Sequence, residues 1–336
     1  MSDSAPNARA PDGICMVEPD SLSRDAITAL LQGAVVAKTL HTVVEVTGPG
    51  ALQCLQGLIT TDVETLGDGS FQYGALLTSK GMIVSDMWVA RRDPSLVLYL
   101  PQRGKDEVLT TFKRSLPPRL AQFVDRTAER RALRIAGPRA LDVLAKAGMV
   151  VPEPGRNETN EDVTAARPAQ GHPFVSQYDC SAEQIERLGS MLIDAGAVSA
   201  PYEALHMSRI LAGWPSLNAE IDAKTLPQEV RFDDIGGVSH SKGCYLGQET
   251  VARLHFRGHA NKRILGLRFD AKPDPTSVTI MHEDRNAGRI TSIAWFGSDL
   301  GYLGLGMIRR EIEVGQTVCA GGANAVTESL PFEARS

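Results

Sequence analysis

A strand, a glycine-proline turn and a helix follow one another twice along the chain. The first copy, VVEVTGPGALQCLQG, begins at residue 43, and the second, ALRIAGPRALDVLAKAG, covers 132–148. In each copy, alternating apolar residues end at the turn, and apolar residues at helical spacing follow it. Proline at the start of a helix and glycine after its end are favoured positions. We infer a duplicated α+β unit.

Other segments add to these two units. The predicted strands are 71–77, 82–91 and 95–100, and the predicted helices are 104–116, 182–197 and 202–213. The strands are joined by short turns and predict an antiparallel sheet. The acidic segment 151–173 has few large apolar residues and is interpreted as a surface loop or linker. Segment 214–240 is irregular, which favours a functional surface.

After Lys262 the pattern changes to short strands with glycine turns, which is typical of a small antiparallel barrel. A chain of 336 residues is long enough for two or three domains. We therefore predict an α+β fold with two α/β domains, ferredoxin-like and duplicated, and a C-terminal antiparallel β-barrel. The predicted limits are 1–13 for a disordered tail, 14–130 and 131–260 for the two α/β domains, and 261–332 for the barrel. Interleaving of the first two domains is left open.

Composition argues against several classes of protein. A formal net charge of −5 gives no overall attraction to nucleic acid or anionic lipid. No run of about 18 apolar residues predicts a membrane span, and the N-terminal residues do not resemble a secretory signal. Five scattered cysteines without a CxxC pair argue against a disulfide framework and a zinc ribbon. We expect a cytoplasmic monomer with reduced thiols, which does not bind nucleic acid or membranes.

The segment SKGCYLGQETVARLHFRGHANKR, residues 241–263, concentrates reactive side chains. If a helix begins near residues 247–249, Cys244 precedes its unpaired backbone N–H groups and lies two residues from Lys242. Both positive charges favour thiolate over thiol, so Cys244 is a candidate reactive or ligand thiol. The alternative interpretation is a structural cysteine in apolar surroundings.

A basic run extends from Arg253 to Arg263. Such a run can hold a polyglutamate tail, a phosphate or RNA, although a solvated helix face explains it more simply. His255 and His259 have the spacing of two metal ligands on one helix face. Gly258 interrupts that helix and no acidic third ligand is nearby in sequence, so no metal site is expected.

Asp86 lies in GMIVSDMWV, where strand alternation places it on one face with Met82 and Val84. A carboxylate on an apolar face needs a partner, which is either an internal arginine or an incoming ligand. The alternative is a solvated position at a strand end. Tyr73, one strand earlier, is interpreted as an aromatic wall of such a site or as a packing residue.

These motifs resemble the YgfZ-type folate-binding proteins that support iron-sulfur proteins, which are related to the aminomethyltransferase (T-protein) of the glycine cleavage system. The most specific match is the signature KGCYxGQE, present from Lys242 to Glu249. Further matches, in the order of the family, are LQGLITTDV (55–63), YGALLTSKGMIVSDMWV (73–89), RILAGWP (209–215) and LPQEV (226–230). The resemblance covers about residues 35–330. It implies two α/β domains and a β-barrel around a central folate pocket.

The resemblance also implies roles for particular residues. Asp86 would be the pocket carboxylate that faces the reactive nitrogens of folate, and Tyr73 would line the pocket beside it. Lys242 and Arg253 would bind the glutamate tail or hold the signature loop, and Cys244 would be the functional thiol. The other residues predicted at the folate site are Glu229, Tyr245, Gln248 and Glu249, of which Gln248 and Glu249 would fix the loop by capping and hydrogen bonds.

Two departures from the aminomethyltransferases bear on activity. In the aminomethyltransferases a glutamate of the RILAG segment holds the pterin ring, and here Leu211 stands in its place. Gln228 or Glu229 stays open as a substitute for that glutamate. The signature of the aminomethyltransferases also lacks the cysteine that this chain has at position 244. We therefore expect a tetrahydrofolate-binding accessory protein, rather than an enzyme, for assembly or repair of iron-sulfur clusters in client proteins. Cys244 would ligate a cluster or partner transiently, or react with a folate-bound one-carbon unit. The alternatives are a tetrahydrofolate-dependent aminomethyltransferase or demethylating enzyme and, more weakly, an RNA-binding module.

Overall fold

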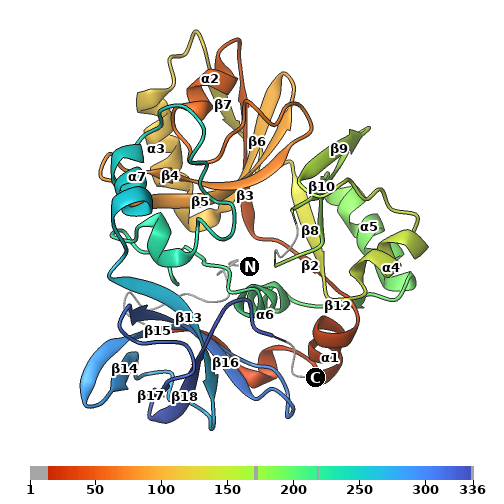
Figure 1. Cartoon of the computed structure of the whole chain (residues 1–336). Coiled ribbons are helices and arrows are strands. Elements are labelled where there is room, and N and C mark those ends of the chain that lie inside the picture. Colours follow the sequence, from red (N-terminus) through yellow and green to blue (C-terminus); the bar gives the residue numbers. More distant parts are fainter. Residues whose placement is uncertain (1–13, 170–172, 218, 334–336) are drawn as a thin grey trace.

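The computed structural model describes residues 14–169, 173–217 and 219–333, which form three lobes around helix α6 (Figure 1). The predicted disordered tail, residues 1–13, lies outside the described residues. In this part of the chain no helix has both the length and the apolar character needed to cross a membrane. The helices are α1 (Arg24–Gln32), α2 (Ala51–Gln56), α3 (Lys105–Ser115), α4 (Ala140–Lys146), α5 (Ala182–Asp194), α6 (Glu203–Leu211) and α7 (Gln248–Arg257), with 3₁₀ turns η1 (Pro19–Ser21), η2 (Gln102–Gly104) and η3 (Pro227–Val230).

The first lobe is built on an antiparallel five-stranded sheet. Its order is β4 (Phe71–Leu77), β5 (Ile83–Arg92), β6 (Ser95–Pro101), β3 (His41–Thr47) and β7 (Gln122–Asp125). One face packs against Leu55 of α2 and Phe112 of α3 in an apolar cluster. Because side chains alternate along each strand, Tyr73, Trp88 and Tyr99 point from the other face into the central core.

The second lobe is built on a six-stranded sheet. Its order is β12 (Val198–Ser199), β2 (Val35–Lys38), β8 (Arg131–Ala136), β11 (Ser176–Cys180), β10 (Val163–Arg167) and β9 (Arg156–Asn160). The β12–β2 pair is parallel and the other pairs are antiparallel. Leu144 of α4 and Leu192 of α5 pack with Ile135 of β8 in the apolar core of this lobe.

The third lobe is a β-barrel. Its strands are β13 (Lys262–Phe269), β14 (Thr279–His282), β15 (Arg285–Trp295), β16 (Tyr302–Arg309), β17 (Thr317–Ala320) and β18 (Ala323–Glu328). Pairing of β15 with β16 closes the barrel around Leu267, Ile290 and Ile308. The predicted α+β fold with a C-terminal antiparallel barrel is confirmed.

Two short N-terminal strands pair with strands of the second and third lobes, which lie far from them in sequence. β1 (Cys15–Val17) pairs in parallel with β15 of the barrel, and β2 lies in the six-stranded sheet beside β8. The first lobe therefore does not contain all of residues 14–130. The domain limits drawn at residues 130 and 260 stay a proposal.

The interpretation of 151–173 as a loop or linker is wrong, because β9 and β10 form an antiparallel pair within it. β9 is an edge strand whose residues are polar, and β10 fills the core with the small side chains of Ala165 and Ala166. Small side chains give little hydrophobic pattern, so the strand is not visible in the sequence. Asn157 of β9 also donates hydrogen bonds to the carbonyl oxygens of Ser70 (2.7 Å) and Arg91 (3.2 Å) in the first lobe.

The two predicted strand-turn-helix units form at β3–α2 and β8–α4, with matching turns. Gly48 and Gly137 begin the turns with φ values of 122° and 108°. Each glycine also lies against a backbone carbonyl, since an added Cβ would be 2.5 Å from the oxygen of Leu120 at Gly48 and 2.6 Å from that of Gly33 at Gly137. Both turns thus require glycine for conformation and for space.

Gly137→Ala should destabilise the protein by about 1–3 kcal/mol, because the new methyl group is strained by the positive φ and collides with the Gly33 carbonyl. The midpoint of urea unfolding measures the loss. The matched control is Gly189→Ala within α5, where a Cβ meets nothing within 4 Å. That change should be neutral or add about 0.5–1 kcal/mol. Equal midpoints for the two variants would contradict the close packing of this turn.

Candidate functional site

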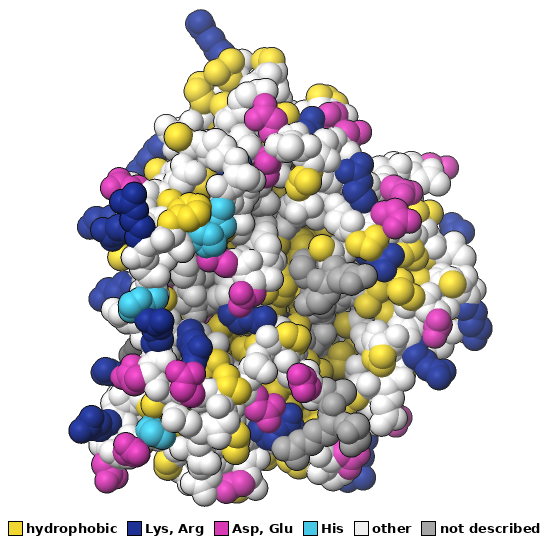
Figure 2. Space-filling view, viewed as in Figure 1, with side chains coloured by type: hydrophobic (Ala, Val, Ile, Leu, Met, Phe, Trp, Pro, Cys, Tyr) yellow, Lys and Arg dark blue, Asp and Glu magenta, His cyan; other side chains and the backbone are white. Residues whose placement is uncertain are grey.

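A cavity of about 170 Å³ lies where β5, β6, β8 and α6 meet. Its lining combines the aromatic side chains of Trp88 and Tyr99 with the charged side chains of Asp86, Arg134 and Arg209. Hydrophobic side chains gather near the middle of the molecule, between the lobes, on the face shown in Figure 2. Flat apolar walls with a few charged groups are typical of a binding site for a small ligand that carries polar groups along its edge.

Asp86 lies on β5 and is 8% exposed. The hydroxyl of Tyr73 donates a hydrogen bond to its Oδ2 (3.0 Å), and Oδ1 has no hydrogen-bond partner among the described residues. Burial raises the pKa of Asp86 to about 6, while the Tyr73 hydrogen bond and the nearby charges of Arg209 and Arg134 limit the rise. Asp86 can therefore accept a hydrogen bond from a ligand at neutral pH.

Tyr73 lies behind Asp86, outside the cavity lining. It is 2% exposed, and its ring packs against Trp214 at a centroid distance of 4.7 Å and Phe232 at 5.3 Å. The prediction for Tyr73 is an aromatic wall of the site or a packing residue. In the structure it packs, and its hydroxyl orients the Asp86 carboxylate.

Arg134 is a site residue that the sequence analysis missed. It lies on β8, is 8% exposed, donates from Nε to Gln177 (2.9 Å) and covers the ring of Phe174 at 3.9 Å. Burial lowers its pKa to about 9, so it stays charged at neutral pH. The sequence feature that could have predicted Arg134 is a charged residue between the apolar residues Leu133 and Ile135 of a strand. Asp86 was predicted from a similar feature, a charged residue within an apolar strand.

Three polar side chains that line the cavity each have one buried atom that makes no hydrogen bond within the described residues. Asp86 Oδ1, Arg134 Nη2 and His41 Nδ1 are buried and have no hydrogen-bond partner among the described residues. Burial and the charge of Arg134 lower the pKa of His41, so its imidazole is neutral. A buried polar atom without a partner costs about 1–3 kcal/mol, which a ligand with both donors and acceptors would recover.

A buried ion pair holds α6 to the barrel. Arg209 of α6 donates from Nη1 to Oε2 of Glu220 (2.8 Å), and Glu220 is fully buried. Glu220 Oε1 accepts hydrogen bonds from Thr291 (2.8 Å) and Ser292 (2.6 Å) of β15. Leu211 at the end of α6 packs against the central core and is outside the cavity lining. Arg209 therefore both lines the cavity and joins α6 to the barrel.

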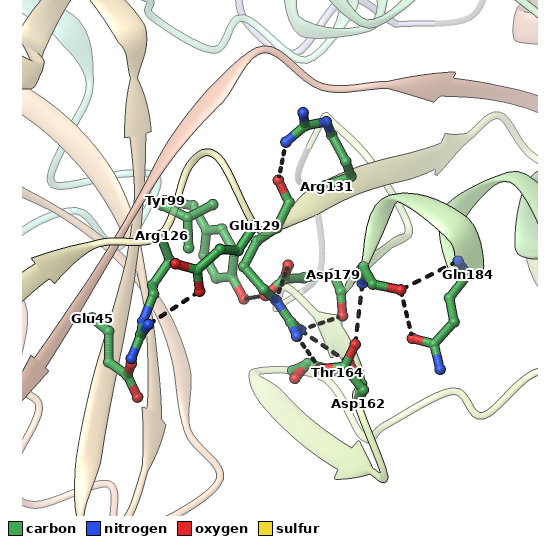
Figure 3. A network of polar contacts seen from close by, with 12 residues as sticks. Glu45, Tyr99, Arg126, Glu129, Arg131, Asp162, Thr164, Asp179 and Gln184 are labelled. Atoms are coloured by element: carbon green, nitrogen blue, oxygen red, sulfur yellow. Dashed lines mark hydrogen bonds and ion pairs between the residues drawn. The ribbon is translucent and has the colours of Figure 1, made fainter.

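Figure 3 shows a second polar network, which includes the cavity residue Tyr99. Tyr99 of β6 donates to Oδ2 of Asp179 on β11 (2.8 Å), and Arg130 donates to Oδ1 of the same carboxylate (3.0 Å). Arg130 also pairs with Asp162. Asp179 is 1% exposed, so these bonds lock the five-stranded and six-stranded sheets together behind the cavity.

Lys242 holds the signature loop. Its ammonium group donates to the carbonyl oxygens of Ile59 (2.8 Å) and Thr61 (2.7 Å), and it lies 5.2 Å from the ring centroid of Tyr245. Lys242 is 7% exposed and burial lowers its pKa to about 8. Of the two roles left open for Lys242, these contacts are those of a residue that holds the loop.

Cys244 is exposed in that loop, ahead of α7, and is not among the residues that line the cavity. Tyr245 beside it is buried and packs into the central core. Gly247 occupies the N-cap of α7 with φ 81° and has no side chain to cap the helix. The cysteine thus lies where a partner molecule can reach it.

The remaining predicted site residues lie outside the cavity lining. Glu229 is 7% exposed, accepts a hydrogen bond from the Leu226 N–H (3.0 Å) and lies 3.6 Å from Lys262, and burial raises its pKa. Gln228 donates to the carbonyl oxygen of Val251 (3.3 Å). Gln248, Glu249 and Arg253 lie on α7, where Glu249 and Arg253 are exposed.

Comparison with known proteins identifies the family. Residues 32–151 match the GCVT N-terminal domain, and residues 261–335 match the CAF17 C-terminal beta-barrel domain. The chain is 30% identical over 228 residues to the tRNA-modifying protein YgfZ of Klebsiella pneumoniae (strain 342), covering 66% of each chain. It is 30% identical over 224 residues to that of Enterobacter sp. (strain 638), covering 66% of this chain and 67% of the relative. The chain belongs to the YgfZ family.

Two further proteins are similar to this chain, one in sequence and one in fold. The iron-sulfur cluster assembly factor IBA57 homolog, mitochondrial, of Neurospora crassa is 29% identical over 254 residues, covering 70% of this chain and 53% of the relative. The glycine cleavage system aminomethyltransferase T from Bartonella henselae has the same fold, with a TM-score of 0.78 over 92% of this chain and 89% of that chain at 18% identity. The match spans 66% of the length of the Klebsiella relative. The predicted YgfZ resemblance is confirmed.

Asp86→Asn tests the burial of the pocket carboxyl. Folded Asp86 keeps its proton up to about pH 6, whereas the unfolded chain loses it near 3.8. Between these values the folded state binds more protons, so this carboxyl makes the wild type less stable as the pH rises from about 4 to 6. The unfolding free energy of the wild type relative to the variant should fall by about 3 kcal/mol over that range. Urea unfolding at fixed pH measures it, with the exposed Asp142→Asn as control, and a constant difference would contradict the burial.

Proposed function

We propose that this chain is a tetrahydrofolate-binding accessory protein that acts in the cytoplasm on the assembly or repair of iron-sulfur clusters in client enzymes. The observation that carries the proposal is the cavity, in which Asp86, Arg134 and His41 each hold a buried polar atom without a partner among the described residues. The name of the Neurospora crassa relative, an iron-sulfur cluster assembly factor, supports the cluster-related role.

The chemistry of the cavity suits a reduced pterin. A pterin is flat and carries N–H donors and a carbonyl acceptor along its edge. The Asp86 carboxylate can accept from such N–H groups, and the Arg134 guanidinium can donate to the carbonyl. The rings of Trp88 and Tyr99 offer apolar surfaces for the ligand face. Tetrahydrofolate is therefore the proposed ligand.

Cys244 acts on the outside of the molecule in this proposal. Its thiol is exposed, lies outside the cavity lining and is carried by a loop that the buried Lys242 holds in place. This position favours transient ligation of a cluster or a client protein over reaction with a one-carbon unit on bound folate. A rigid loop also lowers the entropy cost of presenting the thiol to a partner.

The competing enzymatic function is a tetrahydrofolate-dependent aminomethyl or demethylating transfer, in which Asp86 would position the reacting amine. It is favoured by the fold shared with the aminomethyltransferase. The two functions are separated by incubating the purified protein with tetrahydrofolate and methylamine donors. Steady formation of methylene-tetrahydrofolate would replace the accessory role with the enzymatic one.

The names of the YgfZ relatives, tRNA-modifying proteins, raise direct RNA binding as a further possibility. In this chain several charges of the basic run are neutralised by acidic side chains. Lys262 lies 3.6 Å from Glu229 and Arg263 lies 3.4 Å from Glu313. Basic and acidic side chains are also interspersed on the face shown in Figure 2. We therefore propose a protein client, and RNA binding that falls steeply with added salt would oppose this.

Asp86→Ala should weaken tetrahydrofolate binding at least tenfold, because the ligand loses a charged hydrogen-bond acceptor in a buried site. Isothermal titration calorimetry measures the affinity. Asp142→Ala on the exposed face of α4 is the matched control and should bind as the wild type does. Unchanged affinity of Asp86→Ala would remove the cavity from the proposal.

Cys244→Ser should leave folding and folate affinity unchanged but abolish the support of iron-sulfur enzymes in cells, because serine is a poor ligand for iron and lacks thiol chemistry. The activity of a cluster-dependent enzyme in a strain that lacks the native gene is the readout. Cys319→Ser, at a second exposed thiol, should behave as the wild type. Full complementation by Cys244→Ser would exclude the thiol from the function.

A further inference from the structure

Three side chains from separate segments meet on the surface near α7. Asp233 follows η3, His240 lies in the loop that leads to Lys242, and His255 lies on α7. Oδ1 of Asp233 lies 3.0 Å from Nε2 of His240, and Oδ2 lies 3.1 Å from Nδ1 of His255. One carboxylate therefore contacts two imidazole rings through its two oxygens.

The two imidazole rings stack on each other. Their centroids are 3.6 Å apart and the ring planes differ by 18°. One possible ligand atom from each of Asp233, His240 and His255 lies within 4.8 Å of the others. Zinc binds imidazole nitrogen and carboxylate oxygen at about 2.0–2.2 Å along the lone pair of each ligand atom. The two stacked rings therefore rotate apart when a nitrogen of each, together with the carboxylate, binds one ion.

We propose that Asp233, His240 and His255 form a binding site for a divalent transition-metal ion of the zinc class. Two imidazole nitrogens and one carboxylate oxygen form a ligand set that this class of ion prefers. The side chains of Asp233 and His240 are 30% and 21% exposed, and His255 is exposed, which leaves the remaining coordination positions open to water or to a ligand from a partner. This site is separate from the folate cavity and goes beyond the proposed function.

The sequence pairs His255 with His259, four residues away, and predicts no metal site because Gly258 interrupts the helix between them. In the structure Gly258 ends α7, and His255 meets His240 and Asp233 instead. These ligands are contributed by segments 7 to 22 residues apart, a spacing that matches no local motif. An acidic third ligand is therefore present, but it comes from the turn after η3.

A bound ion would connect the two segments that flank the signature, residues 242–249. His240 lies four residues before Cys244, and His255 lies on the helix that follows it. Coordination of both by one ion would fix α7 against the loop that carries the thiol. Phe256 is 67% exposed and stands edge-on to His255, with centroids 4.7 Å apart and planes at 89°, so an apolar contact surface borders the open side of the site.

Metal titration of the purified full-length protein, first stripped with a chelator, tests the proposal. We expect one equivalent of Zn²⁺ to bind in calorimetry at pH 7.5, and Co²⁺ to give the visible absorption of a nitrogen- and oxygen-ligated ion. His240→Ala and His255→Ala should each weaken Zn²⁺ binding at least tenfold. His259→Ala, an exposed histidine outside the cluster, is the control and should bind as the wild type does.

Absence of stoichiometric binding to the wild type, or equal binding by wild type and His255→Ala, would overturn the site. Loss of binding in His259→Ala would instead assign the metal to the other histidine pair and would also overturn it. Because His255 is exposed on α7, its variant serves as the test if His240→Ala does not fold. Tetrahydrofolate affinity is measured on the same variants and should not change, so the metal proposal and the folate proposal fail separately.

Discussion

The buried ion pair between Arg209 and Glu220 joins the parts of this molecule. Arg209 comes from the central helix, and Glu220 binds two hydroxyl groups of barrel strand β15, so a single carboxylate connects α6 to the third lobe. Removing one partner of a buried pair leaves an uncompensated charge and costs about 3–5 kcal/mol. The same guanidinium lines the cavity, so the geometry of the ligand site depends on how the lobes are assembled.

The cavity contrasts with this well-satisfied network. Around Arg209 and Glu220, and around Asp179, polar atoms pair with one another. In the cavity, Asp86 and Arg134 keep an oxygen and a nitrogen without a partner in the described chain. Proteins lose stability when they bury such atoms, and functional sites are where this loss is commonly tolerated. Unpartnered atoms of Asp86, Arg134 and His41 lie together in the lining of one cavity, and this is the physical basis for treating the cavity as a binding site.

The sequence predicted those features that depend on local pattern. Periodicity located both strand-turn-helix units, the strands around Asp86, and the helices α3, α5 and α6, because large apolar residues repeat at the period of each element. It failed at β10, where Ala165 and Ala166 give no such repeat. Arg134 carried the same signal as Asp86, a charge inside an apolar strand, and could have been found.

Contacts between distant segments account for the other failures. Lys242 was placed correctly in its loop, but its backbone partners, Ile59 and Thr61, lie more than 180 residues earlier. His255 was compared with its sequence neighbour, whereas its actual partners come from the turn and the loop before the helix. Spacing along the chain carries no information on such pairs, since their distance is set by how separate segments pack.

The contact of Lys242 with the first lobe has a consequence for the order of events during synthesis. The carbonyl oxygens of Ile59 and Thr61, which accept hydrogen bonds from the Lys242 ammonium group, belong to a segment that is synthesised early. The loop that carries Lys242 leaves the ribosome late. The loop can only take its final position on a lobe that has already formed. A nascent or misfolded chain would therefore not hold the Cys244 thiol in the position that it has in the folded protein. Through the buried charge of Lys242, the position of this thiol depends on completion of the fold.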